Sequence, residues 1–214
     1  MTVTRRKFLP AAAATVAGST LAAPAIAQSD PVIKWRLTSS FPKSLDTLFG
    51  AATTISRLTA EMTDNKFQLQ PFAAGEIVPA LQVLDAVSNN TVECGHTYTG
   101  YYIGKNPALI FDGSLPFGLT PRMQNAWMLI GNGRKLMDEI YDSFGVVAMP
   151  AGQTGGQMFG WFRKELKTPK DLEGLKMRTA GFGGKVMAKL GVIPQQIAGG
   201  EIYPSLERGT IDAC

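Results

Sequence analysis

From residue 32 onward, short runs of β-branched and aromatic residues alternate with segments of helical periodicity. Residues 32–38 and 67–72 have the composition of strands, and between them the apolar positions of residues 45–62 recur at steps of three and four. Ser44 is the expected cap of this helix. Strands that alternate with helices are typical of an α/β fold with a largely parallel sheet. This alternation constrains the fold of the chain more than any single residue does.

The same pattern continues along the chain. Further strands are expected at 91–98, 146–149 and 175–178, with a hairpin-like segment at 157–162. Further helices are expected through Leu84, over 122–141 with a break at 131–133, from Thr168, and over 185–190. A last strand–helix–strand stretch is expected up to Ile211. Outside the first 27 residues the sequence contains no internal repeat.

The small supply of metal-binding side chains excludes several classes of protein. The 214 residues include one His and two Cys, too few for a Cys/His metal cluster or a disulfide framework. A composition of 45% hydrophobic and 18% charged residues is that of a globular chain and argues against disorder. In an oxidising compartment Cys94 and Cys214 could pair, and the sequence leaves this question open.

The first 27 residues have the pattern of an export signal. Arg5, Arg6 and Lys7 precede an apolar run over 9–23, and small residues follow at a cleavage-like site. The Arg-Arg pair followed by Phe-Leu is typical of the bacterial twin-arginine type. The alternative, a membrane anchor, needs about 20 apolar residues, more than this run supplies. Cleavage before Gln28 would remove three cations and lower the net charge from +4 to +1, so nucleic acid loses most of its support as a partner.

Arg178 is the leading candidate for a binding residue. It stands at the end of the predicted strand 175–178, and the glycines of residues 181–184 lead into the next helix. Ligands of α/β sheets bind beyond the carboxyl ends of the strands, and a helix N-terminus favours an anion. A guanidinium offers a carboxylate two parallel hydrogen bonds, whereas a lysine is a point charge. The alternative is an ordinary surface arginine beside a tight turn.

Four segments form ordered motifs. They are PFAAGEIVP over Pro71 to Pro79, GWFRKE over Gly160 to Glu165, LEGLKMR over Leu172 to Arg178, and IYPSLERGTID over Ile202 to Asp212. Together they resemble the solute-binding subunit of TRAP (tripartite ATP-independent periplasmic) transporters, the DctP-like family, and within it the α-keto acid-binding type. The resemblance implies a periplasmic-binding-protein-like (type II) α/β fold of two lobes. Such a protein would close on a small monocarboxylate, a 2-oxo acid such as pyruvate or a related hydroxy acid, and deliver it to the permease subunits in the membrane.

The resemblance also implies an organisation and a site. Residues 1–27 are the expected signal, 28–150 the first lobe and 151–214 the start of the second. Arg178 corresponds to the strand-borne arginine that pairs with the ligand carboxylate. Gln157 corresponds to a position that reaches both the ligand and a bound sodium or calcium ion, because its amide offers an oxygen and a nitrogen. No organic cofactor and no catalysis are implied.

Aromatic side chains are expected to complete this site. Tyr98, Tyr101 and Tyr102 lie in a loop that resembles the cleft wall of the first lobe, where a phenol could hydrogen-bond the acid. One of the three is expected to be functional and the others to belong to the core, and Tyr101 is the preferred candidate. Phe182 would pack against the small apolar end of the ligand or, equally, fill the junction between helix and strand. Phe41 and Phe117 are weaker candidates, because buried Phe is usually structural.

The family pattern continues past Cys214 with a Glu-Trp pair, which supplies the metal carboxylate and a further ligand contact, and with C-terminal helices, one of which is used for dimerisation. We therefore expect a truncated form whose second lobe and return segments are incomplete. In such a form the cation site lacks its carboxylate, and residues 28–214 would bind 2-oxo acids poorly or not at all. A homodimer is expected only of a full-length form.

Three alternatives to this function remain. Cys94 and His96 are two residues apart on a predicted strand and would face the same side, which suggests a secreted hydrolase with a thiol nucleophile. No second acid, oxyanion motif or cofactor fingerprint accompanies them. The other rivals are a periplasmic interaction module without a small ligand, and a non-functional fragment.

Overall fold

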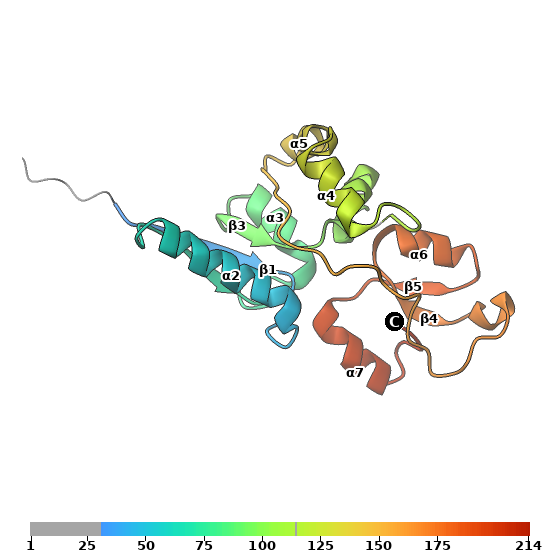
Figure 1. The fold of residues 1–214 in the computed structure, drawn as a ribbon. Helices are drawn as coiled ribbons and strands as arrows, with labels where there is room; N and C mark the ends of the chain where they lie inside the picture. Colours follow the sequence, from blue (N-terminus) through green and yellow to red (C-terminus); the bar gives the residue numbers. More distant parts are fainter. Residues whose placement is uncertain (1–30, 114) are drawn as a thin grey trace, which may run out of the picture. The chain divides into compact units, whose positions relative to one another are not determined.

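A computed structural model describes residues 31–113 and 115–214. The predicted export signal, residues 1–27, lies outside the described residues. Figure 1 shows the order of the strands and helices along the chain. Among the described helices, none is long and apolar enough to cross a lipid bilayer.

Three parallel strands form the first sheet, in the order β2-β1-β3. They are β1 (Ile33–Ser39), β2 (Phe67–Phe72) and β3 (Cys94–His96). β1 is central, and Ser39 at its end pairs with His96 of β3. The last three residues of β1, Leu37, Thr38 and Ser39, are its buried ones, so the carboxyl end of the strand is enclosed. The predicted parallel pairing is confirmed, although β3 is shorter than the predicted strand 91–98.

Helix α2 (Asp46–Met62) follows β1 and packs on β2. The predicted cap is wrong: Leu45 rather than Ser44 is the N-cap residue, and it makes no side-chain capping bond. The Asp46 carboxylate instead accepts the N–H of Thr47 at 2.8 Å in the first turn. A negative side chain at this end of a helix is favourable, so the helix start is stabilised without a hydroxyl cap.

Short helices make up most of the chain between β2 and residue 142, and the last two of them contact each other. They are η2 (Ala80–Gln82), α3 (Val83–Ser88), η3 (Thr99–Tyr102), η4 (Pro107–Asp112), α4 (Pro121–Leu129) and α5 (Gly133–Asp142). The predicted break at 131–133 is confirmed. A Cβ at Gly133 would lie 2.6 Å from the Trp127 ring, so this close approach of α5 to α4 requires glycine. The core here contains Leu109, Met128 and Met137, together with the buried Tyr102 of η3.

The predicted strand at 146–149 is wrong. These residues form neither strand nor helix, and the side chains of Val147 and Met149 are 75% and 73% exposed. A short apolar run is ambiguous because its periodicity does not distinguish a buried strand from an extended surface segment.

The second sheet holds two parallel strands, β4 (Lys176–Arg178) and β5 (Ile193–Gln195). The helices of this region are η5 (Pro169–Leu172), α6 (Gly181–Ala188), η6 (Gly199–Glu201) and α7 (Ile202–Glu207). Thr168 and Asp171 form a capping box at η5, so the predicted helical start is confirmed. Met177 and Met187 form the core of this region together with the fully buried Ala213.

Three local predictions in this region need correction. The hairpin at 157–162 is absent, and only Phe162 pairs, in an antiparallel bridge with Ala213. The helix predicted over 185–190 begins at Gly181, because close packing against β5 outweighs the low helix propensity of glycine: a Cβ at Gly184 would touch Pro194 at 3.4 Å. The last predicted strand is reduced to the two bridges of Ala213.

Candidate functional site

Arg178 and Tyr101 lie together at the centre of the candidate site. Arg178 is the last residue of β4, as predicted, and Tyr101 belongs to η3. The Arg178 Nη2 donates to the Tyr101 hydroxyl at 3.4 Å, and its Nε donates to the carbonyl of Ile197 at 3.3 Å. The structure thus brings together the two residues that the sequence analysis ranked first, although 77 positions separate them.

The Arg178 guanidinium is half-buried and faces no carboxylate. Within residues 31–113 and 115–214 it takes part in none of the ion pairs, and its two partners are a neutral hydroxyl and a neutral carbonyl. Charge-assisted bonds to a carboxylate are typically about 2.7–2.9 Å long, clearly shorter than these two. The guanidinium therefore retains capacity for an anionic partner.

Glycines allow η3 and α6 to approach each other closely beside Arg178. A Cβ at Gly100 would lie 2.3 Å from the Tyr98 ring, and a Cβ at Gly181 would lie 3.3 Å from the Gly100 carbonyl. Gly181 also has a φ of +69°, a conformation that other residues rarely adopt. The Tyr98 ring packs edge-on against the Tyr101 ring with centroids 5.2 Å apart. Tyr98 is therefore a packing partner of Tyr101 at the edge of the site.

Gln196 is a site residue that the sequence analysis missed. Its Nε2 donates to the backbone carbonyl of Tyr101 at 2.9 Å, so side chains at the ends of both β4 and β5 meet η3. The rule that ligands of parallel sheets bind beyond the carboxyl ends of the strands could have identified it, because Gln196 directly follows β5.

The other predicted residues are more dispersed. Phe182, the second residue of α6, is 39% exposed and follows Gly181. Gln157 is exposed in an irregular segment, and its Nε2 donates to the Thr154 hydroxyl at 3.0 Å. Phe41 is buried and packs edge-on against His96, as expected of a structural Phe. Phe117 is fully exposed with a φ of +58°, so the expectation that it is buried was wrong.

Cys94 and His96 are bonded to separate partners on β3. The Cys94 thiol donates to the Arg36 carbonyl at 3.6 Å, and His96 Nδ1 lies 3.3 Å from the Ser39 hydroxyl. Burial, with a smaller contribution from the charge of Glu93, raises the pKa of the Cys94 thiol to about 11, and burial lowers the pKa of His96. The thiolate form needed for nucleophilic attack is therefore disfavoured.

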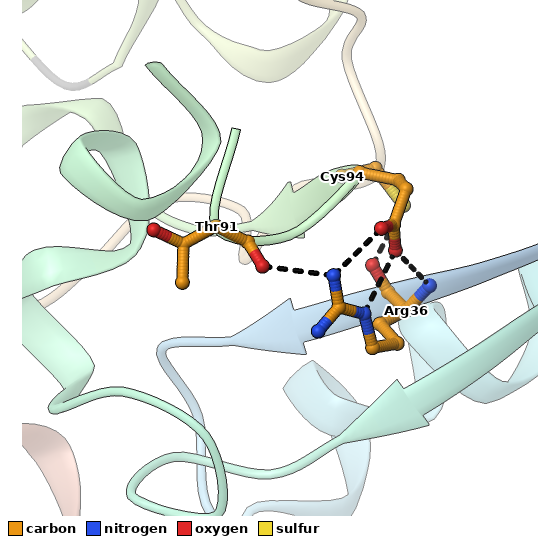
Figure 2. A network of polar contacts seen from close by, with 4 residues as sticks. Arg36, Thr91 and Cys94 are labelled. Atoms are coloured by element: carbon orange, nitrogen blue, oxygen red, sulfur yellow. Dashed lines mark hydrogen bonds and ion pairs between the residues drawn. The ribbon is translucent and has the colours of Figure 1, made fainter. Parts of the chain in front are cut away.

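The charge next to Cys94 belongs to a pairing contact between strands. Figure 2 shows Arg36 donating to the Thr91 carbonyl and to the neighbouring carboxylate. The guanidinium binds Glu93 at 2.7 and 3.0 Å, and the Arg36 backbone N–H donates to the same carboxylate at 2.7 Å. These bonds to Arg36 lower the pKa of Glu93 to about 2. This cluster joins β1 to the start of β3 and has a structural role.

The part of the chain that the structure describes holds no group of three or more His, Cys, Asp or Glu that could bind a metal ion. The exposed Gln157 amide remains the one predicted cation ligand. Both cysteines, Cys94 and Cys214, are free thiols. A surface hollow of about 590 Å³ lies between α4 and α5 with Arg134 and Asp138 in its lining, and it shares no residue with the Arg178 site.

Comparisons with known proteins give consistent matches. Residues 38–214 match the model of the family described as bacterial extracellular solute-binding protein, family 7. A monocarboxylate 2-oxoacid-binding periplasmic protein of Nostoc sp. is 57% identical over 183 residues, which are 86% of this chain and 50% of that protein. The chain spans about half the length of this relative.

Two solved structures are similar over the same region. One is a TRAP transporter solute-binding protein of Bordetella bronchiseptica with calcium and picolinate bound, at 51% identity and a TM-score of 0.84, covering 86% of this chain and 55% of that one. The other is a TRAP periplasmic solute-binding protein of Pseudoalteromonas atlantica with sodium and pyruvate bound. It matches at 41% identity and a TM-score of 0.80, covering 85% of this chain and 55% of that one.

Proposed function

Since this chain belongs to the family of bacterial extracellular solute-binding proteins, family 7, we propose that it binds a small monocarboxylate 2-oxo acid for a TRAP transporter. The resemblance predicted from the four motifs, and the α/β periplasmic-binding-protein fold, are confirmed by the family match and by the similar solved structures. The family is described as one of solute-binding proteins, which supports binding rather than catalysis as the role of this chain.

The observation that carries this proposal is the half-buried Arg178, which faces only neutral partners beside Tyr101. Arg178 would hold the ligand carboxylate through two parallel hydrogen bonds, and the Tyr101 hydroxyl would meet a ligand oxygen next to it. Tyr98 would support the Tyr101 ring from one side. Phe182 would face the small apolar end of the acid, and its partial exposure supports this role.

The relatives support the substrate class. One is named for 2-oxoacids, and solved relatives hold pyruvate with sodium or picolinate with calcium. Within the described residues, Gln157 alone does not make a cation site of this kind, because hard cations take several oxygen ligands. We therefore assign to this chain the contact with the carboxylate end of the ligand.

The remaining assignments rest on the family. The protein would act in the periplasm, exported by the twin-arginine-type signal at residues 1–27, and its partners would be the membrane permease subunits. The two sheets fall on either side of residue 150, which supports lobes at 28–150 and 151–214. One similar structure is described as a dimer, which supports a homodimer as a further assignment.

Calorimetry of the 214-residue chain with pyruvate, with and without sodium or calcium, tests the proposal. We expect weak but saturable binding that Arg178→Ala weakens further, by about 30-fold or more, because a charged hydrogen-bonded pair of this kind contributes about 2–5 kcal/mol. Arg122→Ala, which removes an exposed arginine of α4, is the matched control and should leave the affinity unchanged. Equal affinity of the Arg178→Ala variant and the unmodified chain would contradict the proposal.

A further inference from the structure

The hydroxyl groups of Ser40, Thr97 and Tyr102 form a continuous hydrogen-bonded chain that ends in η3. The Ser40 hydroxyl donates to the Ala80 carbonyl at 2.6 Å and lies 2.6 Å from the Thr97 hydroxyl. The Thr97 hydroxyl lies 2.8 Å from the Tyr102 hydroxyl, which accepts the N–H of Leu84 at 3.3 Å. Ser40 and Tyr102 are only 1% and 3% exposed and Thr97 is half-buried, so water has limited access to these bonds.

The two backbone groups at the ends fix the direction of every bond in the chain. A carbonyl only accepts, so the Ser40 proton points to Ala80, and Ser40 must accept from Thr97. The Thr97 proton is then committed, and Thr97 must accept from Tyr102. Burial raises the pKa of the Tyr102 phenol, which keeps this proton in place. One ordered arrangement therefore satisfies all three hydroxyls.

The chain also joins two positions that a continuous helix would join directly. Ala80 and Leu84 are four residues apart, the spacing of an α-helical hydrogen bond, yet η2 ends at Gln82 and α3 begins at Val83. The hydroxyls of Ser40, Thr97 and Tyr102 are inserted at this junction. They connect it to the end of β1 and to η3, which carries Tyr101 next to Tyr102.

We propose that this hydroxyl chain holds the Tyr101 hydroxyl against Arg178, so that Ser40, Thr97 and Tyr102 are positioning residues of the acid-binding site. Tyr102 is fixed by two hydrogen bonds, and its ring packs edge-on against the Tyr101 ring with centroids 6.4 Å apart. Because they are neighbours in one short helix, a shift of Tyr102 moves Tyr101 relative to Arg178. This inference rests on the proposed function and adds residues that do not touch the ligand.

Thr97→Val tests the inference, because it keeps the shape of the side chain and removes the central hydroxyl. We expect pyruvate affinity to fall about tenfold, roughly the effect of one lost hydrogen bond, and Thr97→Ser to restore it to within about twofold. In a Tyr101→Phe background the same replacement should have no further effect on affinity, although the loss of stability persists. An equal loss of affinity in both backgrounds would show a merely structural role and overturn the inference.

Two additions keep the test decisive. Tyr102→Phe removes the same connection and takes the place of Thr97→Val if that variant does not fold. Thr53→Val is the control, because the Thr53 hydroxyl donates to the Gly50 carbonyl of its own helix. If the unmodified chain does not bind pyruvate, that failure bears on the proposed function, and the NMR resonance of the Arg178 Nε–H decides the inference alone. The chemical shift of that resonance should change in Thr97→Val and return to its original value in Thr97→Ser. In the Tyr101→Phe background, Thr97→Val should leave it unchanged. No movement in Thr97→Val overturns the inference.

Discussion

At the scale of single residues, the candidate site depends on the Arg178 guanidinium, whose hydrogen-bond partners are both neutral. Arg178 donates to a carbonyl at 3.3 Å and to the Tyr101 hydroxyl at 3.4 Å, both long for a guanidinium. A bound carboxylate would replace a long contact with shorter charge-assisted bonds, so the exchange favours the ligand. The glycines beside it matter for a different reason, because they allow two backbones to approach where a side chain would collide.

Gly100→Ala tests whether the space beside the Tyr98 ring tolerates a side chain on η3. The new Cβ would lie 2.3 Å from the Tyr98 ring, so Tyr98 must shift, and we expect a loss of about 1–3 kcal/mol in the free energy of unfolding. Denaturant unfolding measures this loss. Gly104→Ala is the matched control, since a Cβ at Gly104 meets nothing within 4 Å. Equal stability of the two variants would show that η3 tolerates a side chain at residue 100.

At the scale of elements, the pairing of β1 with β3 includes a charged contact that responds to pH. Glu93 has its pKa lowered from 4.5 to about 2 by its bonds to Arg36. A carboxyl group with a lowered folded-state pKa stabilises the fold above its unfolded value, and that contribution is lost as the pH falls through the folded value. The contact is exposed to solvent, so salt should weaken it.

We therefore expect Glu93→Gln to change the pH dependence of unfolding between about pH 4.5 and pH 2. The unmodified chain should lose stability over this window, and the variant should lose less, because its side chain does not titrate. Thermal unfolding across the window measures the difference. Glu139→Gln, at an exposed position of α5, is the control. Identical slopes for Glu93→Gln and the unmodified chain would contradict the account.

Elements with strong periodicity could be predicted from the sequence, and weakly patterned ones could not. α2 and the strands β1 and β2 were predicted because their apolar spacing persists over many residues. The strand at 146–149 and the hairpin at 157–162 were wrong, because a short apolar run forms a strand only where a neighbour pairs with it. α6 was predicted too short, because glycine propensity does not reveal its packing against β5.

At the scale of the whole molecule, the site is assembled from parts that are distant in sequence. Arg178 was found because it ends a strand in a recognised motif, but its contact with Tyr101 spans 77 positions and appears only in the fold. Gln196 and the hydroxyl contact between Ser40 and Thr97 were missed because these contacts also join residues that are distant in sequence, whereas Tyr102 was named only as a residue of the cleft-wall loop. The chain spans about half the length of the relatives it matches, and the described part contains the whole of this contact.

The central claim is that Arg178 meets the carboxylate of the ligand, and the most direct test compares pyruvate with methyl pyruvate, whose ester carries no charge. Calorimetry of the unmodified chain should show the ester binding about 30-fold more weakly than the acid, the effect of losing a charged pair. In Arg178→Ala the acid and the ester should bind with the same low affinity. A preference for the acid that persists undiminished in Arg178→Ala would contradict the account, because the carboxylate would then be held by another group.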